Sequence, residues 1–496
     1  MDSIVFDGFS LSINDLVLVS RNSYKIILSD DSKEKINEAR ASVESFVDSG
    51  KVVYGLTTGF GALKNKIIDK NETAKLQENI ILSHAAGVGN FFSEEISRAI
   101  MLLRVNTFAK GNSGIRLKTV ELLVDMLNNG VHPAIPEKGS VGSSGDLAPL
   151  SHMGLVMLGK GEAFFKGELL SGGEALKRAG LSPIVLSSKE GLAITNGTPV
   201  MTAVGALAVF DAEYLLDIAD IAGALSLEAV EGVPEAFDKR IHEARPHSGQ
   251  LFSAKNLRNL IYGSKLVKSC DVKVQNSYSL RCMPQVHGAS RDAINYIKSK
   301  VEIELNSATD NPLIFDGDVL CGGNFHGQPM ALSFDFLGIA VAELANISER
   351  RTAKLVDPNF NNGLPAFLVK NSGLNSGFMI PQYSAAALVS ENKVLAHPAS
   401  VDSIPTCANQ EDHVSMGTIA ARKARDIVEN SRNVLAIELL TACQAIDFRD
   451  LSKISPKNKF NYDVVRSVVS FMEEDRELYL DMNNVEKLIK NHKFKL

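Results

Sequence analysis

The chain of 496 residues lacks the cysteine patterns and the leader segment that mark several classes of protein. Its five cysteines are widely spaced and include no Cys-x-x-Cys pair, which argues against a zinc cluster and against a disulfide framework. They are Cys270, Cys282, Cys321, Cys407 and Cys443. No basic region followed by an apolar run begins the chain, so we expect no signal peptide and a reducing, cytoplasmic setting.

An excess of positive charge is also missing. The chain has 52 Lys and Arg against 58 Asp and Glu, a formal net charge of -6, and no tryptophan. Because no basic stripe is visible, neither nucleic acid nor a membrane is expected as a partner. The longest apolar region, residues 200–233, is interrupted by acidic residues such as Asp211 and Asp220, which predicts a buried core helix rather than a membrane span.

Three common catalytic motifs are absent as well. There is no Gly-x-Ser-x-Gly nucleophile turn and no glycine-rich phosphate loop ending in Gly-Lys-Ser/Thr. His242 and His247 do not have the His-Glu-x-x-His spacing, and Pro246 stands between them, so no metal site is expected.

Helical periodicity dominates the chain and predicts a mostly α fold. An N-terminal α-rich domain is expected over residues 1–200 and a long helical bundle over residues 201–496. In the first domain we predict a strand at 24–28, a helix from its N-cap Ser32 to about Asp48, and helices at 94–110 and 115–129. Further helices are predicted at 200–233, 253–269, 289–306, 331–354, 384–396, 415–445 and 467–479.

The segment 139–146, Gly-Ser-Val-Gly-Ser-Ser-Gly-Asp, gathers small residues around a serine that is followed at once by glycine. The backbone nitrogen of Gly145 can attack the carbonyl carbon of Ser143 and close a five-membered ring around Ser144. Loss of two waters then leaves a methylidene group on an imidazolone, an electrophile that the ordinary side chains do not supply. The alternative interpretation is a plain turn or an anion-binding nest.

Several other loops concentrate polar side chains. Residues 54–61 place Tyr54 beside three glycines, and residues 275–281 place Tyr278 three positions before Arg281, on the same side of a helical turn. A phenol can transfer protons and a guanidinium can bind a carboxylate, although a packed tyrosine and a surface ion pair are the structural alternatives. Residues 309–312, 322–327 and 409–413 are equally polar, as expected of turns and helix starts.

Together and in this order, these segments resemble the aromatic amino-acid ammonia-lyases, a family with histidine, phenylalanine and tyrosine lyases and related aminomutases. The similarity spans roughly residues 50–450. The matching segments are residues 54–61, 104–106, 139–149, 192–198, 237–250, 278–288, 309–312, 322–327 and 401–416. The resemblance implies a mostly α homotetramer whose active sites draw on three chains, with a helical bundle at its centre.

The resemblance also implies that Ser143, Ser144 and Gly145 cyclise into a methylidene-imidazolone (MIO), with no external cofactor. The family's tripeptide usually begins with alanine, but the ring uses the carbonyl group of Ser143 and not its side chain, so cyclisation is expected here. The MIO would bind the substrate α-amine and make it a better leaving group, while a base removes a proton from the β-carbon.

The family's site residues map onto this chain one by one. Tyr54 and Tyr278 match the catalytic tyrosines, with Tyr54 the first choice of base, and Arg281 matches the group that binds the substrate carboxylate. The remaining matches are Asn196 beside the MIO, Phe325 against its ring, and the polar residues Gln275 and Gln410. Asn276 and Ser277 depart from the family's usual Gln-Asp-Pro-Tyr segment, so the loop before Tyr278 is where a difference in geometry is expected.

Two segments favour histidine as the amino-acid substrate, with trans-urocanate and ammonia as products. Ser83-His84 and residues 410–413, Gln-Glu-Asp-His, both resemble the histidine lyases. Glu411 gives an imidazole ring a charged hydrogen-bond partner, whereas beside a phenyl ring the carboxylate would lack a partner at a cost of about 1–3 kcal/mol. Residues 56–58, Leu-Thr-Thr, instead resemble the tyrosine enzymes.

Three alternatives stay open at this point. A tyrosine ammonia-lyase or an aromatic 2,3-aminomutase would use the same scaffold. A helical protein that has lost catalysis is a second alternative, although the tyrosines and Arg281 argue against it. The fumarase-like lyases are a third, but their Met-Pro-x-Lys-x-Asn segment is absent.

Overall fold

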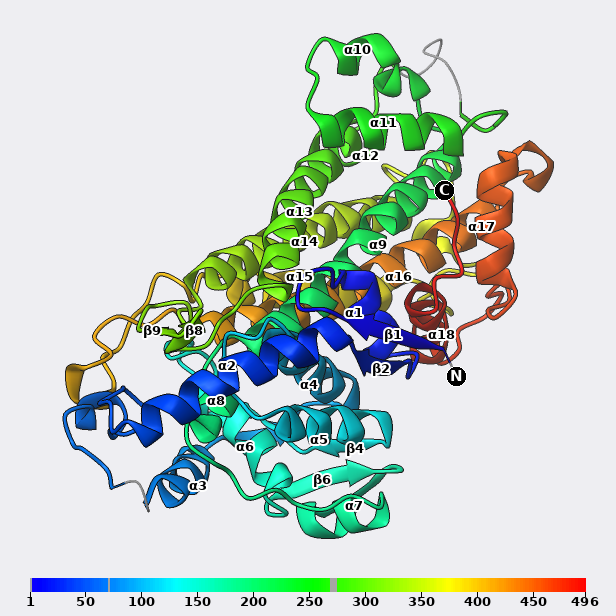
Figure 1. Ribbon diagram of the computed structural model, residues 1–496. Coiled ribbons are helices and arrows are strands. Elements are labelled where there is room, and N and C mark those ends of the chain that lie inside the picture. Colours follow the sequence, from blue (N-terminus) through cyan, green and yellow to red (C-terminus); the bar gives the residue numbers. More distant parts are fainter. Residues whose placement is uncertain (1, 70–71, 268–273) are drawn as a thin grey trace. The chain divides into compact units, whose positions relative to one another are not determined.

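Helices dominate the computed structural model, which describes residues 2–69, 72–267 and 274–496 (Figure 1). The predicted mostly α fold is confirmed. The chain forms two compact units, each built from three segments. Unit 1 comprises Met1–Leu207, Lys298–Asp335 and Pro398–Arg422, and unit 2 comprises Ala208–Ile297, Phe336–His397 and Lys423–Leu496. The division into folding domains at residue 200 stays a prediction, because compactness does not test which segments fold independently.

The helices that lie wholly within unit 1 have 6 to 19 residues, and several begin at serine caps. The predicted helix at 32–48 is α2, but its N-cap is Ser29 and not Ser32: the Ser29 side chain accepts a hydrogen bond from Ser32 N, and Asp30 and Asp31 occupy the first turn. The helices of this unit are α1 (Ile13–Ser20), α2 (Asp30–Asp48), α3 (Thr73–His84), α4 (Glu94–Ala109), α5 (Leu117–Asn128), α6 (Leu147–Met157), α7 (Gly172–Arg178) and α8 (Glu190–Thr195).

Unit 1 also contains short strands. The predicted strand at 24–28 is β2, which pairs in parallel with β1, while β3–β5, β4–β6–β7 and the hairpin β8–β9 are antiparallel. The strands are β1 (Ser3–Phe6), β2 (Lys25–Leu28), β3 (Val88–Phe91), β4 (Val131–Pro133), β5 (Pro136–Lys138), β6 (Glu162–Phe165), β7 (Glu168–Ser171), β8 (Leu313–Phe315) and β9 (Asp318–Leu320).

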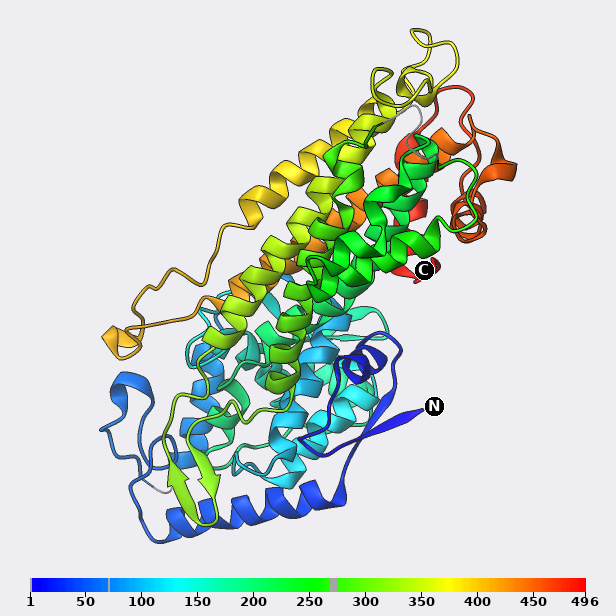
Figure 2. The same ribbon diagram turned by 90° about the horizontal axis from the view of Figure 1, so that it is seen from above.

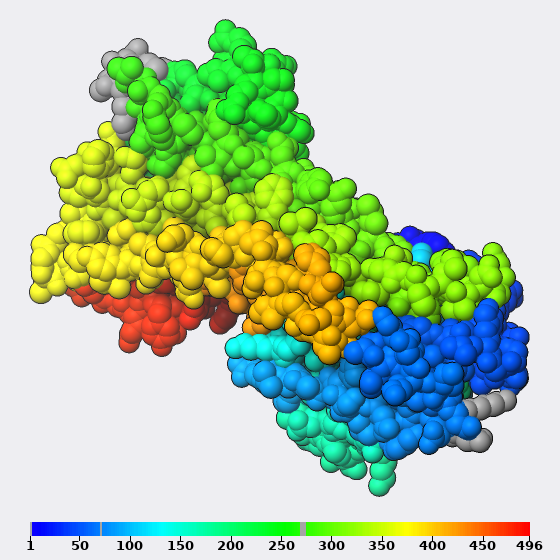
Figure 3. Space-filling view, turned by 90° about the vertical axis from the view of Figure 1, so that its left-hand side faces the viewer, coloured from blue at the N-terminus to red at the C-terminus, as the bar shows by residue number. Residues whose placement is uncertain are grey.

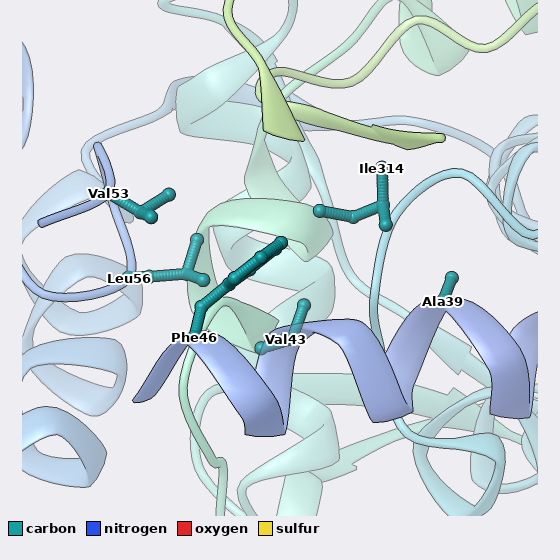
Figure 4. Close-up of a cluster of buried hydrophobic side chains, with 6 residues drawn as sticks. All are labelled: Ala39, Val43, Phe46, Val53, Leu56 and Ile314. Atoms are coloured by element: carbon teal, nitrogen blue, oxygen red, sulfur yellow. The ribbon is translucent and has the colours of Figure 1, made fainter. Parts of the chain in front are cut away.

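A small apolar cluster joins α2 to the loop of Tyr54 and to strand β8. Its six buried members come from α2, the loop before residue 57 and strand β8 (Figure 4). They are Ala39, Val43, Phe46, Val53, Leu56 and Ile314. The β8–β9 hairpin accordingly lies beside α2 (Figure 2). The loop of Tyr54 and the β8–β9 hairpin are therefore both anchored to the same helix.

In unit 2, long helices run side by side (Figure 1). Four of them begin or end in unit 1 and continue through unit 2: α9 (Pro199–Ala229), α13 (Met283–Leu305), α14 (Gln328–Val356) and α16 (Gly417–Ile446). The others are α10 (Lys239–Glu243), α11 (Ser248–Leu260), α12 (Tyr278–Arg281), α15 (Met379–Leu395), α17 (Pro456–Arg466) and α18 (Leu478–Lys490). The helix predicted at 253–269 corresponds to α11, which ends at Leu260, so the prediction is wrong for residues 261–267; residues 268–269, like Cys270, lie outside the described residues.

Most of the helices predicted after residue 200 are present, but the tail helix predicted at 467–479 is wrong. Helix α17 ends at Arg466 and α18 begins at Leu478, so residues 467–477 form a loop. The carboxylate of Asp475 accepts hydrogen bonds from Ser376 N at 2.7 Å and Gly377 N at 2.9 Å. These tertiary bonds hold the segment in a non-helical conformation.

By length and composition alone, two of the described helices could cross a membrane. In α9 and α14, however, 78% and 67% of the most apolar window is buried in the structure. Burial of this kind is typical of core helices, as predicted for residues 200–233.

Candidate active site

A cavity of about 1320 Å³ lies in unit 1. Its wall is formed by loops and helix ends that are far apart in the sequence. In the space-filling view, the segment 398–422, in orange, lies against the blue N-terminal part of this unit (Figure 3). The predicted site residues that line the cavity are Tyr54, His84, Ser143, Ser144, Asn196, Phe325, Gln410 and Glu411.

Backbone contacts clamp the serine-glycine loop on both sides of Gly145. Ser144 and Gly145 have φ angles of +59° and +74°. Gly197 N donates to Ser144 O at 3.2 Å, and Asp146 N donates to Gly197 O at 2.6 Å. A Cβ on Gly145 would lie 1.8 Å from Gly197 O. Only glycine therefore fits at position 145.

The start of the same loop is tied to the segment that precedes α16. Met416 N donates to Val141 O at 2.8 Å. Gly142 O accepts a hydrogen bond from Ser415 Oγ at 2.7 Å and another from Gly327 N at 3.0 Å. A loop rich in glycine and serine is thus fixed by the surrounding backbone.

Asp146 ends the loop as a fully buried carboxylate at the N-terminus of α9. Its two oxygens accept hydrogen bonds from Val200 N at 2.9 Å, Met201 N at 3.0 Å, Ser140 Oγ at 2.9 Å and the Thr418 hydroxyl. Burial raises the pKa of Asp146, while these hydrogen bonds oppose the rise. The carboxylate therefore connects the loop to the start of a long helix.

Glu411 contacts the loop serine directly. Ser144 Oγ donates to Glu411 Oε1 at 2.8 Å, and Thr406 Oγ1 donates to Oε2 at 2.7 Å. A two-way backbone pairing between Thr406 and Glu411 closes the intervening loop. Within it, Cys407, Ala408 and Asn409 all have positive φ angles, a sterically demanding conformation for residues with side chains. The carboxylate is therefore held at a fixed position in the cavity wall.

Tyr54 lies in the loop before the short helical turn Gly61–Leu63. Its hydroxyl oxygen accepts a hydrogen bond from Gly61 N at 3.0 Å. Burial raises the pKa of Tyr54, and the nearby Glu411 carboxylate and the Cys407 and Cys321 thiols raise it further, whereas the Gly61 bond lowers it. The phenol is therefore protonated at neutral pH in the unliganded chain.

His84 is the last residue of α3 and is half-buried in the cavity wall. Its Nδ1 lies 2.9 Å from Ser83 Oγ. Burial lowers the pKa of His84, while Glu411 opposes the shift. At neutral pH the imidazole is therefore mostly neutral, with one nitrogen as donor and the other as acceptor.

A buried arginine fixes the backbone of Asn196. Arg104 Nη1 donates to Asn196 O at 2.6 Å, and Asn196 Nδ2 donates to Asn311 O at 3.0 Å. Burial lowers the pKa of Arg104 to about 10, so its guanidinium stays charged at neutral pH. Among the described residues, no hydrogen-bond partner of Asn196 Oδ1 is found. That oxygen is therefore a buried acceptor whose hydrogen-bonding capacity is not used within the described part of the chain.

Gln275, Tyr278 and Arg281 belong to unit 2 and are not among the residues that line this cavity. They nonetheless contact one another. The Arg281 guanidinium carbon lies 4.7 Å from the centre of the Tyr278 ring, and Arg281 Nη1 donates to Gln275 Oε1. The predicted pairing of a phenol with a guanidinium on one turn is present, and 72% of the Tyr278 surface is exposed.

Two histidines in the cavity wall were not predicted as site residues. The rings of His326 and His413 stack with centroids 5.6 Å apart and an angle of 12° between their planes. Lys64, which donates to Gln410 Oε1 at 2.5 Å, was missed as well. The histidines lie inside the polar segments 322–327 and 401–416, and this position is the feature of the sequence that could have identified them. No comparable feature of the sequence points to Lys64.

Long helices and a clamped serine-glycine loop, in a cavity that also holds Glu411, are features of one class of lyase. Residues 11–467 match the aromatic amino acid lyase family, and the chain belongs to it. It is 60% identical to a histidine ammonia-lyase of Alkaliphilus oremlandii, covering 99% of this chain and 97% of that one. A histidine ammonia-lyase of Alkaliphilus metalliredigens is 56% identical, with 99% and 98% covered.

Solved structures agree in fold. The crystal structure of histidine ammonia-lyase from Trypanosoma cruzi has a TM-score of 0.93 at 45% identity, covering 99% of this chain and 94% of that chain. The crystal structure of a tyrosine aminomutase from Streptomyces globisporus has a TM-score of 0.95 at 38% identity, with 99% and 97% covered. The chain is accordingly a carbon-nitrogen lyase.

Proposed function

We propose that this chain is a histidine ammonia-lyase that converts L-histidine into trans-urocanate and ammonia. The reaction breaks the Cα–N bond and one Cβ–H bond and forms a C=C bond, with no change of oxidation state that needs a redox partner. The observation that carries the proposal is Glu411, whose carboxylate lines the same cavity as His84 and Ser144. A charged acceptor at this place suits an imidazole substrate, whereas beside a phenyl ring the carboxylate would have no hydrogen-bond donor.

The loop fits the MIO that the family resemblance implies. Positive φ angles at Ser144 and Gly145 fold the tripeptide back, and Gly197 binds the backbone on either side of Gly145. No hydrogen-bond partner of Gly145 N is found among the described residues, so this nitrogen is available to close a ring onto the Ser143 carbonyl carbon. The MIO supplies the electrophile for the substrate amine.

The chain's own residues bind and orient the substrate around that group. Glu411 and His84 hold the imidazole, and Asn196 Oδ1 accepts a hydrogen bond from the ammonium group. Tyr54 removes the β-proton. Because its pKa is raised in the unliganded chain, the positive charge of the bound substrate has to favour the phenolate. Phe325, which lines the same cavity as Ser143 and Ser144, excludes water from the reacting groups.

Arg281 binds the substrate carboxylate, with Tyr278 beside it as the second catalytic phenol and Gln275 and Gln410 as polar site residues. Since Tyr278 and Arg281 do not line the cavity of the chain that carries Tyr54, we propose that a neighbouring chain of a homotetramer supplies them. The proposed setting of this assembly is the cytoplasm.

The first experiment is a near-ultraviolet assay of the purified protein with L-histidine and, in parallel, with L-tyrosine. Urocanate from histidine alone supports the proposal. Coumarate from tyrosine contradicts it, and a β-amino acid product would identify an aminomutase. Intact mass reports whether two waters have been lost, and an uncyclised, inactive protein would favour the inactive scaffold.

Glu411→Ala tests the residue on which the substrate assignment depends. Hydrogen bonds to charged groups contribute about 1.5–3 kcal/mol, so kcat/KM for histidine should fall about ten- to hundredfold. Asp412→Ala removes the neighbouring exposed carboxylate and serves as the control, with a smaller expected effect. Equal losses in both variants would mean that general negative charge, and not Glu411, favours histidine.

A further inference from the structure

The turn that carries Tyr278 and Arg281 is too short to hold its own orientation. Helix α12 has four residues, one turn, and an isolated turn of that length is not stable in water. Its exposed phenol is flanked by buried residues: 72% of Tyr278 is exposed, against 6% of Asn276 and 5% of Leu280. The direction of both functional side chains therefore depends on contacts that these neighbours make.

Asn276 makes two of these contacts, both to the backbone of Val233. Its Oδ1 accepts a hydrogen bond from Val233 N at 2.9 Å, and its Nδ2 donates to Val233 O at 2.7 Å. One side-chain amide thus satisfies both backbone groups of Val233, just beyond the end of α9. A carboxylate at this position could accept from Val233 N but could not donate to Val233 O. The departure from the aspartate usual in the family's Gln-Asp-Pro-Tyr segment therefore has a structural consequence.

A second contact reaches the turn from the buried side of unit 2. Arg351 Nη1 lies within hydrogen-bond reach of Ser279 O, at 3.4 Å. Arg351 itself is fixed by Glu438, with Nε–Oε1 and Nη2–Oε2 distances of 2.6 and 2.8 Å, and both side chains are fully buried. The turn is therefore held at Asn276 and at Ser279, on either side of Tyr278.

We propose that Asn276 is a positioning residue for the lyase reaction: its amide fixes turn α12 and so aims the Tyr278 phenol and the Arg281 guanidinium. This rests on the proposed function, which assigns substrate contacts to those two residues. When the amide is lost, the turn shifts while its side chains stay intact. Since Arg281 binds the substrate carboxylate, the KM for histidine rises. A displaced Tyr278 lowers kcat as well.

The test compares Asn276→Asp and Asn276→Ala with a matched control, Asn128→Ala. Asn128 makes the same pair of bonds to the backbone of Ile26, at 2.8 and 2.9 Å, in unit 1. We expect kcat/KM for histidine to fall on the order of ten- to hundredfold in both Asn276 variants, chiefly through KM. Hydrogen exchange of the backbone amides of residues 278–282 should become faster.

Asn128→Ala should reduce thermal stability and leave KM and this exchange unchanged. The proposal is overturned if the Asn276 variants keep the KM and exchange rates of the unmodified protein, or if Asn128→Ala changes KM equally. If the unmodified protein does not produce urocanate, the proposed function fails. In that case the exchange of residues 278–282 alone decides whether Asn276 fixes the turn.

Discussion

Burial decides how Tyr54 can act as a base. Its pKa is raised by desolvation and by the nearby Glu411 carboxylate, and an unperturbed phenol already titrates near pH 10. A base has to be deprotonated to act. Because the pKa of Tyr54 is raised, its phenolate form keeps increasing as the pH rises through the alkaline range. We expect kcat/KM to keep rising through the alkaline range without a plateau below about pH 10.

The measurement is a pH profile of kcat/KM for the unmodified protein, Tyr54→Phe and Cys407→Ser. Tyr54→Phe should lose roughly 10²–10⁴-fold in rate. Cys407 Sγ accepts a hydrogen bond from Ala62 N at 3.3 Å in the same cavity wall, so Cys407→Ser tests whether the thiol carries the profile. A plateau near neutral pH, or an alkaline rise that disappears in Cys407→Ser, would contradict the role of Tyr54.

At the residue scale, sequence patterns singled out many of the residues that line the cavity of unit 1, but not how those residues bond to one another. Ser144 and Glu411 both stood out, yet their 2.8 Å hydrogen bond joins positions 267 residues apart, which no local pattern contains. The cap of α2 shows the same limit, since Ser29 and Ser32 both precede an acidic, helix-forming stretch. The backbone conformation at Ser29, φ -64° and ψ 152°, decides between them.

At the scale of elements, the site depends on the backbone hydrogen bonds by which Gly197, in segment 195–198, clamps the serine-glycine loop at Ser144 and Asp146. A Cβ on Gly197 would lie 2.7 Å from Thr309 Oγ1 and 2.9 Å from Arg104 Nη1, and φ at this glycine is +130°. Gly197→Ala should therefore push the segment away from Ser144 and Asp146 and release the clamp. We expect the variant to fold but to keep the mass of the uncyclised chain, with both waters retained.

The control for this prediction is Gly180→Ala. Gly180 also has a positive φ, +74°, but a Cβ there would meet nothing within 4 Å. This variant carries backbone strain of about 1 kcal/mol without a steric clash near the site, and it should lose two waters like the unmodified protein. Complete cyclisation in Gly197→Ala would show that the clamp is dispensable for maturation.

Elements with long periodic patterns were predicted well, and those fixed by tertiary contacts were not. The segments 289–306, 331–354 and 415–445 correspond to α13, α14 and α16, because an apolar stripe sustained over many turns is a strong signal. The tail helix failed because Asp475 binds the backbone of Ser376 and Gly377, contacts that lie outside any local window.

At the scale of the whole molecule, each unit is built from three separate segments of the chain. The sequence pattern does not reveal this arrangement. Residues 298–335 and 398–422 join the N-terminal segment in unit 1, and they bring Phe325, Gln410 and Glu411 with them. A boundary drawn at residue 200 would assign all three to the helical part. Composition changes at about residue 200, but the cavity takes its wall from both sides of that position.

The last prediction concerns how chains share a site. Ser144 lines the cavity of unit 1, whereas Tyr278 belongs to unit 2 and does not line it. If a neighbouring chain supplies Tyr278, then Ser144→Ala and Tyr278→Phe should each be inactive alone but active when co-expressed in one assembly. Random mixing would leave about a quarter of the sites with both intact residues, and so about a quarter of the activity.

Mixing the two variants after separate purification is the control and should restore little, provided that light scattering shows stable oligomers. If one chain supplied both residues, no mixed assembly could contain an intact site, and co-expression would restore nothing.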